Sequence, residues 1–267
     1  MTEIPSWSAE MWPIAPPSEA DWLYELCGDG STGFMPPALP DAAWVLHAMY
    51  EHESGPVEAT YDDLDKGRVD VDRIDPRILA YMESEASYLR GEHPGPDWRR
   101  LRWSELAERT GDPLVPEGDY PSHHCFPSAG ADNSWPVSLW APDYGCLDRP
   151  SWNRLIDILI THGPDGQDTR TTAHYSLMNL VTGSAKTDLS SDGASSLVLT
   201  GHLADAKPLY DAPFAECNPA NLFAADRSWI TCTDIDLWAT KVVGPPALIK
   251  ALLDDDEIEA IRIPWKH

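Results

Sequence analysis

The sequence predicts an α+β protein, with a helix-rich first half and, in the second half, a mostly antiparallel sheet covered by helices. Residues 228–233 and 237–243 are rich in β-branched and aromatic side chains, and the triplet 234–236 between them has the composition of a turn, which indicates a hairpin. Residues 148–162 begin with a capping aspartate and repeat apolar side chains at helical spacing. This helix is expected to cover the sheet.

The predicted hairpin continues into a complete unit of local structure. Gly244 ends its second strand, and Pro245 and Pro246 favour the start of a helix. The apolar stripe of that helix consists of Leu248, Ile249, Leu252 and Leu253. A last strand over 258–263 is expected to form an edge of the sheet, because Pro264 ends it.

Other segments give the remaining elements and the domain organisation. Strands are expected over 135–140, 171–181 and 195–201, and helices over 18–27, 41–53, 75–90 and 104–110. Segments 54–75, 112–134 and 203–225 have the composition of loops. We expect a single domain over 1–267 or two packed lobes, a helix-rich lobe over 1–134 and a sheet-containing lobe over 135–267.

The net charge of the chain disfavours some classes of binding partner and favours others. The chain has 44 acidic and 19 basic residues, a net charge of −25, and such a field repels nucleic acid and anionic lipid while attracting a basic protein. The competing interpretation is that acidity only keeps the protein soluble. No apolar run approaches the roughly 20 residues that span a bilayer, and residues 1–17 lack a signal-peptide pattern, so we expect a cytoplasmic protein that does not bind membranes.

Cysteine spacing bears on metals and disulfides. The five cysteines are far apart and form no C-x-x-C pair, which argues against a zinc ribbon and a disulfide framework. We expect reduced thiols and neither a cofactor nor a stoichiometric metal.

Metal-ligand residue types gather at one place, near the end of the helix expected over 41–53. His47 and Glu51 are four residues apart and would share a face, whereas His52 would point away, unlike the ligands of zinc-peptidase helices. A metal-assisted hydrolase that uses these three residues with Asp234 or Asp236 is therefore an alternative function, and a solvated polar helix end is the competing interpretation.

A cysteine beside two histidines, His123-His124-Cys125, is the candidate for nucleophilic catalysis. Activation of a thiolate requires pairing in space, which adjacency in sequence does not provide, and no known signature surrounds the triplet. We therefore leave open whether the protein is an enzyme and favour a binding function.

Candidate binding residues lie in the C-terminal unit. They are Asp234, Asp236 and Trp238 around the hairpin turn, and the acidic run Asp254, Asp255, Asp256 and Glu257, expected at the exposed end of the last helix. The basic segment 98–103 (WRRLRW) is expected to pair with the protein's own carboxylates. The twelve tryptophans suit either a core or an aromatic-lined ligand site.

Several of these residues carry a resemblance. Trp229, Asp234, residues 236–238 and 248–249, with the segments CGDGSTGFMPP and WRRLRW, resemble a family of uncharacterised bacterial proteins over most of the chain. The resemblance implies no activity, cofactor or site residue.

Charge and the incomplete catalytic motifs together favour a non-enzymatic function. We expect an acidic cytosolic protein of the immunity or antitoxin kind that covers a basic partner protein. The metal-assisted hydrolase and an aromatic-lined binder of small ligands are the alternatives.

Overall fold

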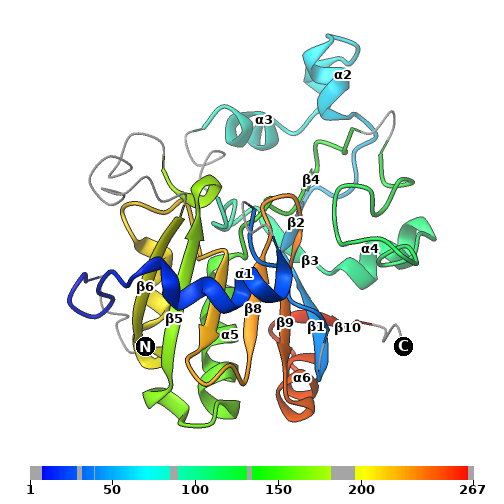
Figure 1. Ribbon diagram of the computed structural model, residues 1–267. Coiled ribbons are helices and arrows are strands. Elements are labelled where there is room, and N and C mark those ends of the chain that lie inside the picture. The colour runs from blue at the N-terminus through cyan, green and yellow to red at the C-terminus, as the bar shows by residue number, and fades with distance from the viewer. Residues whose placement is uncertain are drawn as a thin grey trace.

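A computed structural model describes residues 8–28, 32–38, 40–84, 90–130, 134–181 and 196–263. These residues form an α+β architecture around a seven-stranded sheet in which every neighbouring pair is antiparallel (Figure 1). In spatial order the strands are β10 (Glu259–Arg262), β1 (Asp41–Leu46), β9 (Ala239–Gly244), β8 (Ile230–Thr233), β7 (Asn221–Ala224), β5 (Arg170–Ser176) and β6 (Ser196–His202).

The C-terminal unit is confirmed as predicted. Strands β8 and β9 pair in antiparallel register from Ile230↔Val243 to Thr233↔Thr240, and α6 (Pro246–Leu253) follows with prolines at its start. Strand β10 pairs with β1 and forms one edge of the sheet.

The helix predicted over 41–53 is wrong, because this segment forms β1 and then β2 (Met49–His52). Strand β1 lies between β10 and β9, and all six of its residues are buried. Ala43 and Val45 enter the core beside α6, whereas Ala42 faces the opposite layer. A strand with both faces covered has a continuous apolar sequence, which periodicity does not distinguish from a buried helix.

The loop expected over 203–225 contains β7, a central strand between β8 and β5. Asn221 is unusual in a strand but fully buried here, and its side chain pairs with the backbone of Phe34. Its Oδ1 accepts from Phe34 N at 2.8 Å, and its Nδ2 donates to Phe34 O at 2.8 Å. The segment 32–38 is thereby tied across the sheet face.

A smaller sheet lies at one end of the large one, with β2 between β3 (Trp98–Leu101) and β4 (Leu139–Trp140) (Figure 1). The helices of the first half are α1 (Asp21–Cys27), α2 (Tyr61–Asp65), α3 (Pro76–Met82) and α4 (Trp103–Thr110). The first half therefore contains strands β1–β3 as well as helices. The predicted helix over 75–90 is confirmed for 76–82, and residues 85–89 of it lie outside the described part.

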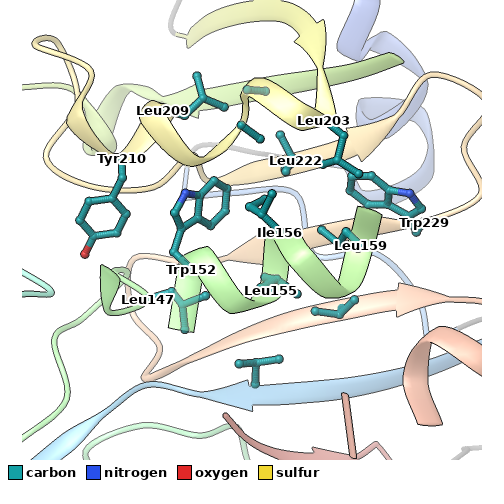
Figure 2. Packing of buried hydrophobic residues seen from close by; sticks show 14 of the residues in the cluster. Leu147, Trp152, Leu155, Ile156, Leu159, Leu203, Leu209, Tyr210, Leu222 and Trp229 are labelled. Carbon is teal, nitrogen blue, oxygen red and sulfur yellow. The ribbon is translucent and has the colours of Figure 1, made fainter. Parts of the chain in front are cut away.

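The hydrophobic core lies between the sheet and α5 (Arg149–His162) with α6 (Figure 2). The predicted cap is confirmed, since Asp148 Oδ2 accepts from Ser151 N at 3.1 Å, and its Oδ1 accepts from Ala48 N at 3.0 Å. The α5 residues Trp152, Leu155, Ile156 and Leu159 are buried in this layer. Helix α1 lies across the other face, where Leu23 and Phe34 pack on Phe223.

An N-terminal arm closes the second edge of the sheet. Ala15 N donates to Val198 O at 2.9 Å, and Thr200 N donates to Pro13 O at 3.1 Å, so the arm pairs with β6. Trp12 anchors the arm, since its ring is buried and its Nε1 donates to Asp205 O at 2.7 Å.

Short 3-10 helices complete the described chain, at Pro17–Ala20, Val71–Arg73, Gly166–Asp168, Leu177–Asn179, Leu203–Asp205 and Lys207–Asp211. In the part of the chain that the structure describes, none of the helices has the length and apolar character needed to traverse a bilayer.

Candidate functional site

The fold brings together two groups of predicted site residues that are far apart in the sequence. Trp238 N, just after the β8–β9 turn, donates to Pro121 O at 2.9 Å. The ring centroid of His123 lies 6.4 Å from that of Trp238, and the ring centroid of Tyr144 lies 5.4 Å from it. We call the region formed by Tyr120, His123, His124, Tyr144, Asp236 and Trp238 the Trp238 surface.

The surface is aromatic, carries one carboxylate and two imidazoles, and is accessible at its rim. Tyr120 is 55% exposed and Tyr144 is 39% exposed, and His123, His124 and Asp236 are also exposed. Trp238 itself is buried beneath them. Tyrosine and tryptophan present large rigid areas with a polar tip, which suits a binding surface.

The β8–β9 turn is held by Asp234. Its Oδ1 accepts from Asp236 N at 2.9 Å, and its Oδ2 accepts from Thr32 Oγ1 at 2.9 Å. Burial raises the pKa of Asp234, and the two hydrogen bonds that its carboxylate accepts indicate a structural role in the turn. Asp236 is the exposed carboxylate of this pair.

Gly145 lets the 143–145 segment lie against the turn. Its φ is +60°, and a Cβ at this position would lie 2.5 Å from Ile235 Cα. Gly145 N donates to Leu237 O at 2.9 Å, which fixes the position of the neighbouring Tyr144. Only glycine combines this backbone conformation with such a close approach.

Aromatic rings support Trp238 from below. Trp135 and Trp103 lie with ring centroids 5.4 and 6.2 Å from that of Trp238, both at steep interplanar angles. Trp238 Nε1 is buried and has no hydrogen-bond partner among the described residues. A buried donor without a partner is costly, and a bound acceptor would remove that cost.

Cys125 belongs to the same loop but points inward. It is fully buried, its Sγ lies 3.8 Å from Tyr120 O, and burial raises the pKa of its thiol. His123 and His124 are exposed and contact each other, with ring centroids 3.8 Å apart. A nucleophilic cysteine requires a lowered pKa, so this environment favours the inert thiol.

The three metal-ligand candidates have separate partners. Glu51 forms ion pairs with Arg99 and Arg109, and His52 Nδ1 lies 2.7 Å from Ser54 Oγ. The predicted internal pairing of the 98–103 segment is confirmed for Arg99. His47 lies in the link between β1 and β2, and the described residues contain no group of three or more potential metal ligands.

His47 belongs to a chain of buried hydrogen bonds. Its Nδ1 lies 3.0 Å from Asp143 O, and its Nε2 lies 3.1 Å from Thr240 Oγ1. Thr240 Oγ1 lies 2.8 Å from Thr233 Oγ1, which accepts from Asn218 Nδ2 at 2.9 Å. Burial lowers the pKa of His47 to about 4, so the neutral ring is the folded form.

This burial predicts a pH dependence of stability. An unfolded histidine has a pKa near 6.5, so between pH 6.5 and 4 the unfolded chain binds more protons than the folded one. Burial of the neutral His47 ring therefore leaves the free energy of unfolding unchanged above pH 6.5 and lowers it as the pH falls. At pH 4 the loss is roughly 2–3 kcal/mol. Urea unfolding at pH 7 and pH 4 should show a smaller loss in His47→Gln than in the wild type. The exposed His162 provides the control, since His162→Gln should lose as much stability as the wild type; equal losses in all three proteins would contradict the prediction.

The acidic run after α6 is not a uniformly exposed patch. Asp255 has a side chain only 5% exposed, which is paired with Arg154, and its Oδ1 accepts from Glu257 N at 3.0 Å and Ile258 N at 3.1 Å. Asp254, by contrast, is 60% exposed and pairs with Lys250. Asp255 therefore organises the turn into β10, which corrects the expectation that the whole run is exposed.

We expect Asp255→Asn to lower the free energy of unfolding by about 1–2 kcal/mol, because it weakens a charge-assisted bond and two backbone bonds at once. The exposed side of Arg154 keeps the effect below that of a fully buried pair. Asp254→Asn should change stability by less than about 0.5 kcal/mol. Thermal unfolding measures both, and equal effects would contradict the role given to Asp255.

The comparisons with known proteins add no relative. No family model matches the chain, and no match is found among curated proteins or among solved structures. The resemblance to uncharacterised bacterial proteins therefore stays a prediction.

Sequence reasoning missed Tyr120 and Tyr144 as members of the Trp238 surface. They lie in turn-rich segments without periodicity, where an aromatic residue gives no signal of its contacts. The one available signal was the presence of large aromatic residues in segments whose composition predicts loops.

Proposed function

We propose that the protein is a cytoplasmic binding protein of the immunity or antitoxin kind, and that it covers a basic protein with the Trp238 surface. The distribution of charge carries this proposal. Most lysine and arginine side chains of the described residues form ion pairs with the protein's own carboxylates, as Arg99, Arg149 and Arg262 do. These internal ion pairs do not change the net charge of the chain, which is −25 and attracts a basic partner.

The Trp238 surface provides the short-range part of recognition. Lysine and arginine side chains can lie over the ring faces of Tyr144 and Tyr120, and Asp236 places a carboxylate near Tyr144. Residues of this type dominate the binding energy of protein interfaces when their supports are rigid. Trp135 and Trp103 supply that support beneath Trp238.

The proposal predicts association that depends strongly on salt. Exposed charges are screened over about 8–10 Å at 0.1–0.15 M salt, so the association rate with the basic partner should fall steeply as salt rises, while the dissociation rate changes less. Stopped-flow kinetics with the partner isolated from the source cells measures both rates. An association rate independent of salt would refute the electrostatic part of the proposal.

Two variants locate the surface. Asp236→Asn should slow association at low salt, and Tyr144→Ala should raise the dissociation rate by at least about tenfold, as loss of an interface anchor does. Asp165→Asn is the matched control, because Asp165 is an exposed carboxylate in the turn between α5 and β5, at the other end of the sheet from the β8–β9 turn. Equal effects of Asp165→Asn and Asp236→Asn would show that the partner does not bind at the Trp238 surface.

An aromatic-lined site for a small ligand is the second candidate. The buried Trp238 Nε1, which has no partner among the described residues, favours it. A ligand that quenches tryptophan fluorescence in the wild type and not in Tyr144→Ala would support this function over protein binding.

A further inference from the structure

A hollow of about 200 Å³ lies where the N-terminal arm crosses the first residues of β5, and it is separate from the Trp238 surface. Ile14 and Pro16 of the arm line one side, and Thr172 of β5 and Thr200 of β6 line the sheet side. Glu19 and Arg170 add one negative and one positive side chain. Drug-sized ligands occupy about 300–1,000 Å³, so this hollow suits a smaller molecule.

The walls of the hollow are fixed by backbone pairing. The arm is bonded to β6 on both sides of Ile14, through Ala15 N to Val198 O and through Thr200 N to Pro13 O. Thr172 and Thr200 face each other directly in the β5–β6 register. A site whose walls are already ordered loses little conformational entropy when a ligand binds.

Arg170 differs from most of the described basic residues. Its side chain is exposed at the hollow, and it forms no ion pair within the described parts of the chain. In a chain with so many carboxylates, an arginine that remains without one keeps its guanidinium free for a carboxylate from outside. Glu19 lines the same hollow and can accept from an ammonium group.

We propose that this hollow binds a small zwitterion of the α-amino-acid type. The ligand's carboxylate contacts Arg170, its ammonium contacts Glu19, and its small side chain lies against Ile14 and Pro16. Net charge explains why a zwitterion fits better than a simple anion. The field of a chain with a charge of −25 repels anions, whereas a molecule without net charge enters without that penalty. The threonine hydroxyls supply further donors and acceptors for its polar groups.

Isothermal titration calorimetry with each of the twenty α-amino acids tests the proposal. We expect saturable binding of at least one small amino acid, and binding at least tenfold weaker for propionate and propylamine, which each carry one of the two charges. Propionate that binds as well as the amino acid would overturn the zwitterion, and the absence of saturable binding by all twenty would overturn the site.

Variants connect that binding to the hollow. Arg170→Gln and Glu19→Gln should each weaken binding of the amino acid at least tenfold, whereas Arg73→Gln, which removes an exposed arginine from the Val71–Arg73 turn, should leave it unchanged. Both hollow residues are exposed, so their variants are expected to keep the wild-type unfolding temperature without ligand. Unchanged affinity in Arg170→Gln would overturn the proposal. The Trp238 surface is untouched by these variants, so the result is independent of partner binding.

Discussion

Replacing Leu252 with alanine is expected to lower the free energy of unfolding by about 2–5 kcal/mol, the range observed when a fully buried leucine site is emptied. Leu252 is completely buried in the core layer between α5, α6 and the sheet, together with Leu248 and Ile249. Helix α6 packs against α5 and against β1, β9 and β10, so the cavity would lie among close-packed elements of the core.

The matched control for Leu252→Ala is Lys250→Ala on the same helix. Lys250 is exposed, and its ion pair with Asp254 is a surface contact, so this variant should change stability by less than about 0.5 kcal/mol. Urea unfolding followed by circular dichroism measures both variants. Similar losses of stability would mean that α6 presents a different face to the sheet.

Replacing Gly145 with alanine should have an effect of the same size by a different mechanism. The positive φ of +60° costs a side chain about 1–2 kcal/mol, and displacement of the backbone at Ile235 adds about 1–3 kcal/mol. The total is roughly 2–5 kcal/mol. Because Ile235 and Tyr144 move with this contact, the variant should also weaken binding at the Trp238 surface.

Gly118→Ala distinguishes the cost of the positive φ from the cost of the close approach to Ile235. The φ of Gly118 is +88°, but a Cβ there would meet no atom within 4 Å, so Gly118→Ala has only the backbone cost of about 1–2 kcal/mol. Thermal unfolding of both variants gives the cost of the close approach as their difference. A Gly145→Ala variant no less stable than Gly118→Ala would show that the 143–145 segment moves away from the turn without loss.

The sequence predicted best where a local signal marks a boundary of an element. The β8–β9 hairpin, α6 and α5 each have a turn, a proline or a capping aspartate at a boundary, and all three are confirmed. Strand β1 has buried residues on both faces, so no periodicity distinguishes it from a helix. Strand β7 was missed because Asn221 is polar, and its burial depends on Phe34, 187 residues away.

The candidate site was predictable only in pieces. Asp236, Trp238 and His123 were chosen for their residue types, but their proximity depends on the hydrogen bond from Trp238 N to Pro121 O, which joins two distant segments. The four-residue spacing of His47 and Glu51 would place them on a common face only if the segment were a helix. In the structure His47 lies in the link between β1 and β2 and Glu51 lies on β2, and their partners are Thr240 and Arg99 respectively.

The arm that pairs with β6 also bears on solubility. An open edge strand offers unpaired backbone groups to any extended chain, and such edges initiate aggregation. Residues 13–15 pair with two of those groups on β6, Val198 O and Thr200 N, and the buried ring of Trp12 holds them there. Loss of the Trp12 anchor would therefore expose an edge able to recruit a second molecule. The acidic surface of the chain, which repels its own copies, is the remaining protection against that self-association.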